Sequence, residues 1–410
     1  MKKLIIIIII VLSCIRINAQ TLTGVVCDNV TKQTIPGVYV YFDGTSIGDV
    51  TDNSGRFTLT LKQMINTNLV FRHLIYKMLI IEDGLFMHLP DTIYMEEQPP
   101  KMLGDVIVQA DNFSRRQRLR AFREQFLGTT QAGKSCRILN EDEIQLSFNL
   151  ATKTLRASSD KPIEVINEYL GYKILFTLFE FWTEYSDATL DPDKAERSYR
   201  LVTASFSDLK QGDMITKKRR DEVYEESSRN FFKTLAYDSF FDSNTLQNPV
   251  FKFYKGGTPI DFRSYFTIKD TLSLKMIKLS DAIIERRNRD NSLLNIRVLH
   301  REKLEFERYY GDMYYLREGS SPNNSNISQF NNTNTRGSVT ANSFVNSISD
   351  LQKSSSQNYE STNYYSHISF FTNTLLVDQY GNIDQSDKVL FSGMMGWARA
   401  GDMLPKDYEP

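Results

Sequence analysis

Apolar and polar residues alternate along much of the chain after residue 161, which is the pattern of half-buried β-strands. The run FKFYK at residues 251–255 is an example, because it places Phe251 and Phe253 on one face and Lys252 on the other. Antiparallel sheets with one face in water have this pattern. We therefore predict strands at Ile163–Ile166, Tyr172–Phe179, Tyr199–Phe206, Val250–Tyr254, Tyr265–Lys278, Leu293–Leu299, Leu304–Tyr315, Ser366–Val377 and Lys388–Trp397.

Two segments have helical spacing instead. Within Lys217–Asp238, one face carries the stripe Tyr224, Ser228, Phe231, Phe232 and Leu235 under a charged outer face, which predicts one helix. Within Asn112–Leu127, Leu119, Phe122 and Phe126 share a face among five arginines. Such a basic helix could contact anionic lipid or lipopolysaccharide, but a connector whose arginines are solvated is the simpler interpretation.

The N-terminal part of the chain has shorter strands separated by turn residues. The β-branched and aromatic runs predict strands at Leu22–Val26, Val38–Phe42, Phe57–Leu61 and Thr92–Met95. Gly, Asp and Asn between them supply the chemistry of tight turns. In the turn at 52–55 we expect Gly55 to take a positive φ and Asp52 to accept hydrogen bonds from backbone N–H groups.

These strands and turns closely resemble the carboxypeptidase-regulatory-like domain, a transthyretin-like β-sandwich. The matching residues are Gly24–Val26, Ile35–Val40, Gly44-Thr45 and Thr51–Phe57, whereas the family's usual Gly-Tyr is replaced by Ile75-Tyr76. Together with the strand pattern, the resemblance predicts a fold class that is mainly β. In this prediction, an N-terminal Ig/transthyretin-like β-sandwich is followed by a larger antiparallel β domain with one or two helices.

The segment Leu103–Val108 resembles the one that follows this domain in many Bacteroidetes outer-membrane proteins. The tail Met403–Tyr408, with Phe126–Thr130 and Leu170–Lys173, resembles secreted Bacteroidetes proteins of no assigned activity. In that group the regulatory-like domain is also frequent at the N-terminus of TonB-dependent receptors, although this chain has no room for a receptor barrel. The resemblance thus implies a Bacteroidetes envelope protein and supplies no chemistry.

The ends and interruptions of these patterns predict the domain organisation. Residues 1–19 have the lysines, apolar run and small-residue end of a secretory signal peptide. The mature chain then comprises the sandwich at 20–97, a linker strand and amphipathic helix at 98–127, and a β-rich domain at 128–410. Residues 319–362 are rich in Asn and Ser, which predicts a disordered loop inside that domain. We expect export to the periplasm or the outer membrane.

Charge and cysteine content narrow the classes of partner. Lys+Arg 49 balance Asp+Glu 50, which favours neither nucleic-acid binding nor a polybasic membrane surface. No segment of the mature chain is apolar enough for a transmembrane span. Cys14 could be lipidated, but the residues around it fit a lipobox poorly. A disulfide between Cys27 and Cys136 is possible, whereas two unpaired thiols are the simpler interpretation.

Metal chemistry has no signature in this sequence. Zinc carboxypeptidases need His-x-x-Glu and a second, distant His, because two imidazoles and a carboxylate must meet at one ion. The only histidines are His73, His88, His300 and His367, and none has Glu three residues later. We therefore predict the regulatory-like domain without a zinc peptidase, and we assign no metal ligand and no cofactor.

Serine and carboxylate chemistry is no better supported. Ser-x-x-Lys occurs at Ser158–Lys161 and Ser207–Lys210, in polar stretches where chance matches are expected. Paired carboxylates could serve a glycosidase, although solvated turns and helix faces are their ordinary setting. These pairs are Glu180 with Glu184, Asp191 with Asp193, and Asp238 with Asp242. No catalytic residue is assigned.

The sequence therefore favours a non-enzymatic, extracytoplasmic protein of the cell envelope, with a binding or assembly role toward a protein or glycan partner. One alternative is a secreted hydrolase with a carboxylate-based site in 128–410. Another is an accessory of a TonB-dependent outer-membrane system. A deep cleft with two carboxylates would favour the hydrolase. Closed cores with an exposed aromatic patch or a free strand edge would favour binding.

Overall fold

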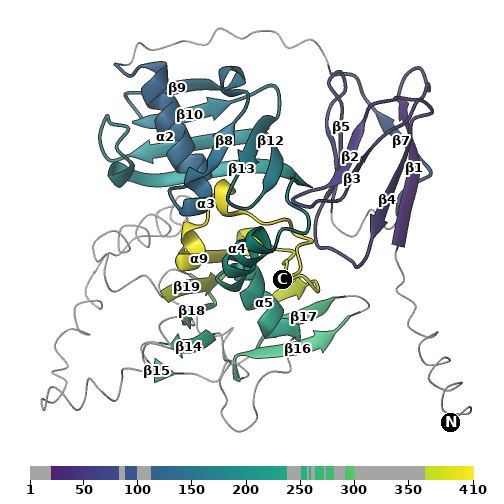
Figure 1. Ribbon diagram of the computed structural model, residues 1–410. Coiled ribbons are helices and arrows are strands. Elements are labelled where there is room, and N and C mark those ends of the chain that lie inside the picture. The colour runs from purple at the N-terminus through teal and green to yellow at the C-terminus, as the bar shows by residue number, and fades with distance from the viewer. Residues whose placement is uncertain are drawn as a thin grey trace, which may run out of the picture.

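The computed structural model describes residues 20–82, 88–98, 112–237, 251–255, 258–259, 264–271, 274–280, 291–300 and 365–410. The predicted signal peptide, the segment 103–108, the strand at 304–315, the loop at 319–362, and Asp238 and Asp242 lie outside these residues. No helix in the described part of the chain is long and apolar enough to cross a membrane. Three hydrophobic cores organise the structure (Figure 1).

The N-terminal sandwich, residues 20–97, holds the first core. Its strands are β1 Gln20–Asp28, β2 Tyr39–Phe42, β3 Gly48–Val50, β4 Arg56–Leu61, β5 Leu69–Arg72, β6 Leu79–Ile81 and β7 Thr92–Met95. One sheet has the order β4-β1-β7 and the other β3-β2-β5-β6. Phe57 of one sheet meets Phe71 of the other edge to face, with ring centroids 5.5 Å apart. The predicted β-sandwich is confirmed.

The turn before β4 has the predicted chemistry. Gly55 has φ +71°. Its N–H donates to the Asp52 carbonyl, and the Asp52 carboxylate accepts from the backbone N–H groups of Ser54 and Arg56 at 2.8 and 2.9 Å. A methyl group on Gly55 would approach the Val26 carbonyl to 2.7 Å, so the turn needs glycine for space as well as for φ.

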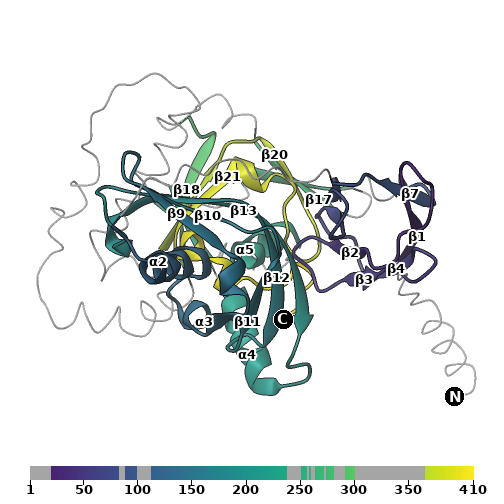
Figure 2. The ribbon, with the colours of Figure 1, turned by 90° about the horizontal axis from the view of Figure 1, so that it is seen from above.

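The central unit, residues 112–227, is built on a six-stranded sheet with the path β8-β11-β12-β10-β9 and with β13 paired to β12. Its strands are β8 Cys136–Ile138, β9 Gln145–Asn149, β10 Thr154–Ser158, β11 Ile163–Asn167, β12 Tyr172–Tyr185 and β13 Ala195–Asp208. The helices α2 Arg115–Leu127 and α3 Gln131–Lys134 lie on one side of this sheet (Figure 2). Strands β8, β9 and β10 fall in the stretch where the sequence pattern is mixed.

Helix α2 is part of the central core rather than a solvated connector. Phe122 and Phe126 are fully buried, stack on each other, and meet Phe181 of β12 edge to face. The arginines lie on the opposite, outer side, where Arg120 pairs with Glu124. The helix therefore buries its apolar face against the sheet, which leaves no apolar stripe for a lipid surface.

The single helix predicted at 217–238 is two helices, α4 Met214–Glu225 and α5 Ser228–Tyr237. The break follows from Ser227, whose hydroxyl accepts the N–H of Asn230 at 3.2 Å and so caps the second helix. Helix α4 packs on the central unit through Tyr224, whereas Phe231 and Phe232 of α5 belong to the third core.

The C-terminal unit, residues 228–395, surrounds that third core. Its sheets have the orders β15-β14-β18-β19-β21 and β16-β17-β20. The strands are β14 Phe251–Lys255, β15 Thr258–Pro259, β16 Phe266–Asp270, β17 Lys275–Leu279, β18 Leu294–His300, β19 Tyr365–Phe370, β20 Thr374–Val377 and β21 Val389–Gly393. Residues 128–410, which the sequence suggests as one β-rich domain, thus contain two cores.

Three strand predictions in this unit are wrong in detail. The strand predicted at 265–278 is the antiparallel pair β16 and β17. The strand predicted at 366–377 is two strands, β19 and β20, which belong to different sheets. The last strand stops at Gly393 and continues as helix α9 Met394–Trp397. Gly393 has φ +70°, and a Cβ there would lie 2.1 Å from the Tyr365 carbonyl, so the close approach of β19 turns the chain out of the sheet.

The C-terminal tail returns from the third unit to the central unit. Ala400 and Leu404 are buried in the central core, and the yellow tail passes between the units in Figure 1. Helix α5 holds the tail, because Arg229 donates to the carbonyls of Pro405 and Tyr408 at 2.6 and 3.0 Å. The 3-10 helices of the described chain are Glu141–Glu143, Pro192–Lys194, Ser386–Lys388 and Ala400–Asp402.

Candidate binding surface and domain junction

The four histidines are dispersed. His73 and His88 lie at the surface of the N-terminal sandwich, and His300 and His367 are on the neighbouring strands β18 and β19. Across the described residues, no group of three or more His, Cys, Asp or Glu is arranged to hold a metal ion. Cys27 and Cys136 are free thiols.

His300 forms a buried polar pair that the sequence does not reveal. Its Nε2 lies 2.8 Å from the hydroxyl of Ser366, which also accepts the N–H of Met395 at 3.0 Å. A hydroxyl and an imidazole within hydrogen-bond distance are also the elements of a serine–histidine dyad. Ser366 has no exposed surface and His300 is 3% exposed, so a substrate cannot reach the pair. The pair is structural, and its members are too far apart in sequence to form a motif.

The Ser-x-x-Lys matches lie on the surface. Ser158 and Ser207 are exposed, Lys161 pairs with Glu143 at 2.6 Å, and Lys210 belongs to the loop after β13. Neither serine is at the start of a helix, where the lysine one turn on would reach it. These matches form no catalytic arrangement.

One member of each carboxylate pair inside the described chain, Glu184 and Asp191, has a structural partner. Glu184 forms an ion pair with Arg197 across the β12–β13 pairing, and Asp191 accepts the N–H of Asp193 at a helix start. Glu184 and Glu196 do contribute to a depression at the end of β10 and β12. Lys153 and the backbone around Ser186 occupy the same depression and are bonded to each other. It is an open polar hollow.

The N-terminal sandwich is joined to the central sheet by its β2–β3 loop. The N–H of Gly44 donates to the Ala204 carbonyl at 2.6 Å, and the N–H of Phe206 donates to the Thr45 carbonyl at 2.9 Å. The Asp43 carboxylate accepts the N–H of Ala204 at 2.8 Å. This loop therefore adds a short parallel bridge to the edge of β13, which is the way one sheet edge receives another chain segment.

A second connection comes from the loop at 378–382 in the C-terminal unit. The ring of Tyr380 is 3% exposed and belongs to the core of the N-terminal sandwich. The Asp378 carboxylate accepts the N–H of Asn66 at 2.8 Å, and the Asn66 side chain donates to the carbonyls of Leu376 and Asn382. Burial raises the pKa of Asp378, although hydrogen bonds from the Asn382 side chain and from the backbone N–H groups of Asn66 and Asn382 oppose the shift.

The C-terminal tail makes the third connection. The N–H of Lys406 donates to the Gly44 carbonyl at 2.7 Å, and the Lys406 ammonium donates to the Thr67 hydroxyl at 2.7 Å. Asp407 accepts the N–H of Ser46 at 2.8 Å. The sandwich thus meets both other units through hydrogen bonds and a shared core, and the three parts form one packed body.

The central sheet carries an aromatic patch on its outer face, formed by Phe179, Trp182, Tyr199 and Leu201. Phe179, Tyr199 and Leu201 are 46%, 41% and 49% exposed. Trp182 lies opposite Tyr199 in the β12–β13 pairing, and the two rings stack with centroids 5.8 Å apart. The patch is beside the junction, because Thr203, two residues beyond Leu201 on β13, bonds the Tyr41 hydroxyl.

Two features of the sheet create this patch. A register shift between Leu178 and Glu180 places Phe179 at a β-bulge, which changes the direction of the side chains that follow. Strand β13 pairs only with β12 among the described strands, so it is a sheet edge. The sequence predicts both strands, but only the register shows that these four side chains share a face.

The class of the first domain follows from its two small sheets, joined through the Asp-Asn-Ser-Gly turn: it is a β-sandwich. Residues 22–82 match the family model of the CarboxypepD_reg-like domain. The predicted family of the N-terminal domain is thereby confirmed, and a non-catalytic regulatory or binding role is consistent with it. No curated protein matches the chain.

Proposed function

We propose that this protein is a non-enzymatic component of the cell envelope, which its N-terminal signal sequence sends to the periplasm or the outer membrane. There it binds a protein or glycan partner through the aromatic patch. The observation that carries the proposal is the patch itself, since large aromatic side chains at a sheet edge are typical of recognition surfaces.

The composition of the patch favours a protein partner over a glycan. Stacked rings such as Trp182 and Tyr199 suit both kinds of ligand. Phe179 and Leu201 add apolar surface that has no polar atom to offer a sugar hydroxyl. The neighbouring edge of β13 already receives the Asp43–Thr45 loop, so the same edge is suited to another extended segment.

The rest of the structure supports a binding role rather than catalysis. The three cores are filled by apolar side chains, and the carboxylates of Glu184 and Asp191 are bonded to neighbouring groups. The junction holds the sandwich against the units that carry the patch. We infer that the sandwich braces this surface.

Site-specific photocrosslinking tests the proposal. A photoreactive amino acid replaces Leu201 in the full chain, and the same residue at Leu139, which is 45% exposed outside the patch, is the control. We expect a reproducible crosslinked species in the envelope fraction from position 201 and none from 139. The double variant Phe179→Ser/Tyr199→Ser should remove it. Equal crosslinking at both positions, or none at 201, would contradict a binding role for the patch.

The same preparation tests export. We expect the mature protein in the envelope or periplasmic fraction to begin at Gln20, directly after the predicted cleavage site. A chain that retains Met1 and fractionates with the cytoplasm would contradict the proposed location. A glycan partner would instead appear as a change in tryptophan fluorescence on titration with envelope polysaccharide, because Trp182 lies in the patch.

A further inference from the structure

The loop between β13 and α4, together with the first turn of α4, carries three exposed apolar side chains. Leu209, Met214 and Ile215 are 50%, 76% and 64% exposed. The N–H of Asp213 donates to the Lys210 carbonyl at 3.1 Å, and this turn brings the residues on its two sides close together. We call residues 209–218 the apolar tip.

The tip projects from the body of the molecule. It is the lowest described segment in Figure 2, beyond the edge of the central sheet. A methyl group added to Gly212 would meet no atom within 4 Å, so the turn is open to solvent on that side. A projecting convex tip can bury only a small contact area against a folded protein, whereas it can insert into the headgroup layer of a lipid bilayer.

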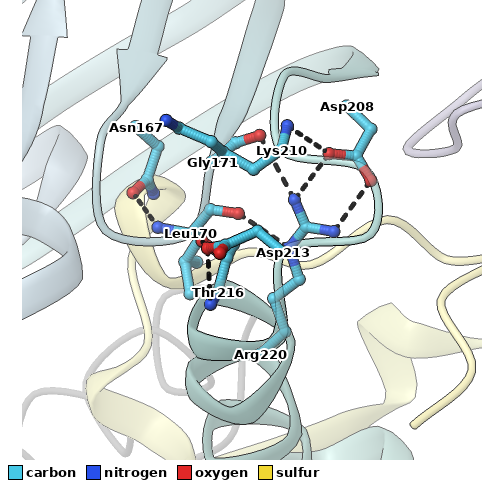
Figure 3. Close-up of polar contacts among 8 residues, drawn as sticks. All are labelled: Asn167, Leu170, Gly171, Asp208, Lys210, Asp213, Thr216 and Arg220. Carbon is cyan, nitrogen blue, oxygen red and sulfur yellow. Dashed lines mark hydrogen bonds and ion pairs between the residues drawn. The ribbon is translucent and has the colours of Figure 1, made fainter.

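The base of the tip is held rigidly (Figure 3). The Arg220 guanidinium makes two hydrogen bonds to Asp208 at 2.7 and 2.8 Å, and it donates to the carbonyls of Leu170 and Gly171. Asp213 caps α4 by accepting the N–H of Thr216 at 3.0 Å. This anchoring holds the loop ends, so Met214 and Ile215 remain exposed on the first turn of α4 instead of folding back.

Lysines surround the apolar side chains. Lys210, Lys217 and Lys218 are exposed, and the side chain of Lys218 is 80% exposed. Lys217 and Lys218 pair with Asp221 and Glu222, which lie one turn further along α4 from the tip. Within the tip, the basic residues Lys210, Lys217 and Lys218 outnumber the one acidic residue, Asp213, and this excess of basic groups suits an anionic membrane surface.

We propose that the apolar tip is a membrane-docking site: Leu209, Met214 and Ile215 enter the headgroup region of an anionic lipid bilayer while the lysines contact its phosphates. This site differs from the aromatic patch in residues and in ligand. It gives the protein peripheral contact with a membrane.

Vesicle co-sedimentation of residues 20–410 tests this inference. We expect binding to vesicles of phosphatidylcholine with phosphatidylglycerol, little binding to phosphatidylcholine alone, and weaker binding at high salt because the charges are exposed. Met214→Ser/Ile215→Ser should weaken binding about tenfold or more, since apolar area no longer leaves water. Lys217→Gln/Lys218→Gln should weaken it about tenfold for the anionic vesicles only.

The matched control is Leu74→Ser/Ile75→Ser, which removes two adjacent exposed apolar side chains from the N-terminal sandwich. It should bind vesicles like the unaltered protein. Unchanged urea midpoints for all variants will show that they are folded. No binding to anionic vesicles, or equal loss in the control, would overturn the inference. A dimer that Met214→Ser/Ile215→Ser abolishes, with vesicle binding unchanged, would show that a second copy covers the tip instead.

Discussion

Tyr380 of the C-terminal unit is buried in the core of the N-terminal sandwich. The variant Tyr380→Ala tests how strongly this contact stabilises the sandwich and couples its unfolding to that of the other units. The ring is 3% exposed. A buried aromatic side chain removes about 200 Å² from water, and at about 25 cal/mol per Å² this amounts to about 5 kcal/mol. Aromatic-to-alanine changes in cores cost about 3–5 kcal/mol, so we expect a loss of about 4 kcal/mol, a large part of the stability of a typical domain.

The assay is equilibrium urea unfolding of residues 20–410, followed by far-UV circular dichroism and by tryptophan fluorescence. The chain's two tryptophans, Trp182 and Trp397, are outside the sandwich, whereas dichroism reports on every unit. In the unaltered protein we expect coincident transitions, because the units share a core and hydrogen bonds. In Tyr380→Ala the dichroism transition should begin at lower urea, since the sandwich loses its shared core residue.

Tyr94→Ala is the control for this experiment, because Tyr94 is in the same sandwich but 47% exposed. It should cost about 1 kcal/mol or less. The reasoning is refuted if Tyr380→Ala is no more destabilising than Tyr94→Ala. If the dichroism and fluorescence transitions of the unaltered protein occurred at different urea concentrations, the conclusion that the three units form one packed body would likewise be refuted.

Two further predictions concern buried polar groups. Arg220→Met leaves Asp208 without its charged partner and should cost about 3 kcal/mol at neutral pH. Arg220 lowers the pKa of Asp208, so the variant and the unaltered protein should differ less in free energy of unfolding below about pH 4. A difference in unfolding free energy that stays constant with pH would contradict the ion pair. Burial lowers the pKa of His300 to about 4. Between about pH 6.5 and 4 the imidazole is therefore protonated only in the unfolded chain, and the free energy of unfolding should fall by about 3 kcal/mol as the pH is lowered through that range. His300→Gln can keep the hydrogen bond to Ser366, and it should reduce the dependence of the unfolding free energy on pH between about pH 6.5 and 4. An unchanged pH dependence in this variant would show that other titrating groups cause it.

Much of the fold was predictable because its determinants are local. The turn at 52–55 needs Gly55 for its positive φ and Asp52 for its hydrogen bonds, and both requirements are visible in the sequence. The alternation of β12 and β13 likewise predicts their strands, although both extend beyond the predicted limits. The break at Ser227 was missed because the apolar stripe runs on through it.

The candidate surfaces were less predictable. Tyr199 and Trp182 meet only because β12 and β13 pair in a particular register, and Phe179 joins them through a bulge. Leu209 and Ile215 are exposed because Arg220 fixes the loop ends, while similar apolar residues elsewhere are buried. Residue type alone does not determine which apolar side chains are buried against other residues and which stay exposed.

The sequence by itself determined the mainly β architecture, the family of the first domain and the turn chemistry of that domain, because periodicity and backbone conformation depend on neighbouring residues. Only the tertiary structure decided that α2 is a core helix, that residues 128–410 contain two cores, and that Tyr380 and Lys406 join the sandwich to the other units. These outcomes depend on contacts between residues far apart in the sequence, from Phe122 with Phe181 to Thr67 with Lys406. The register and packing that create such contacts are properties of the whole fold.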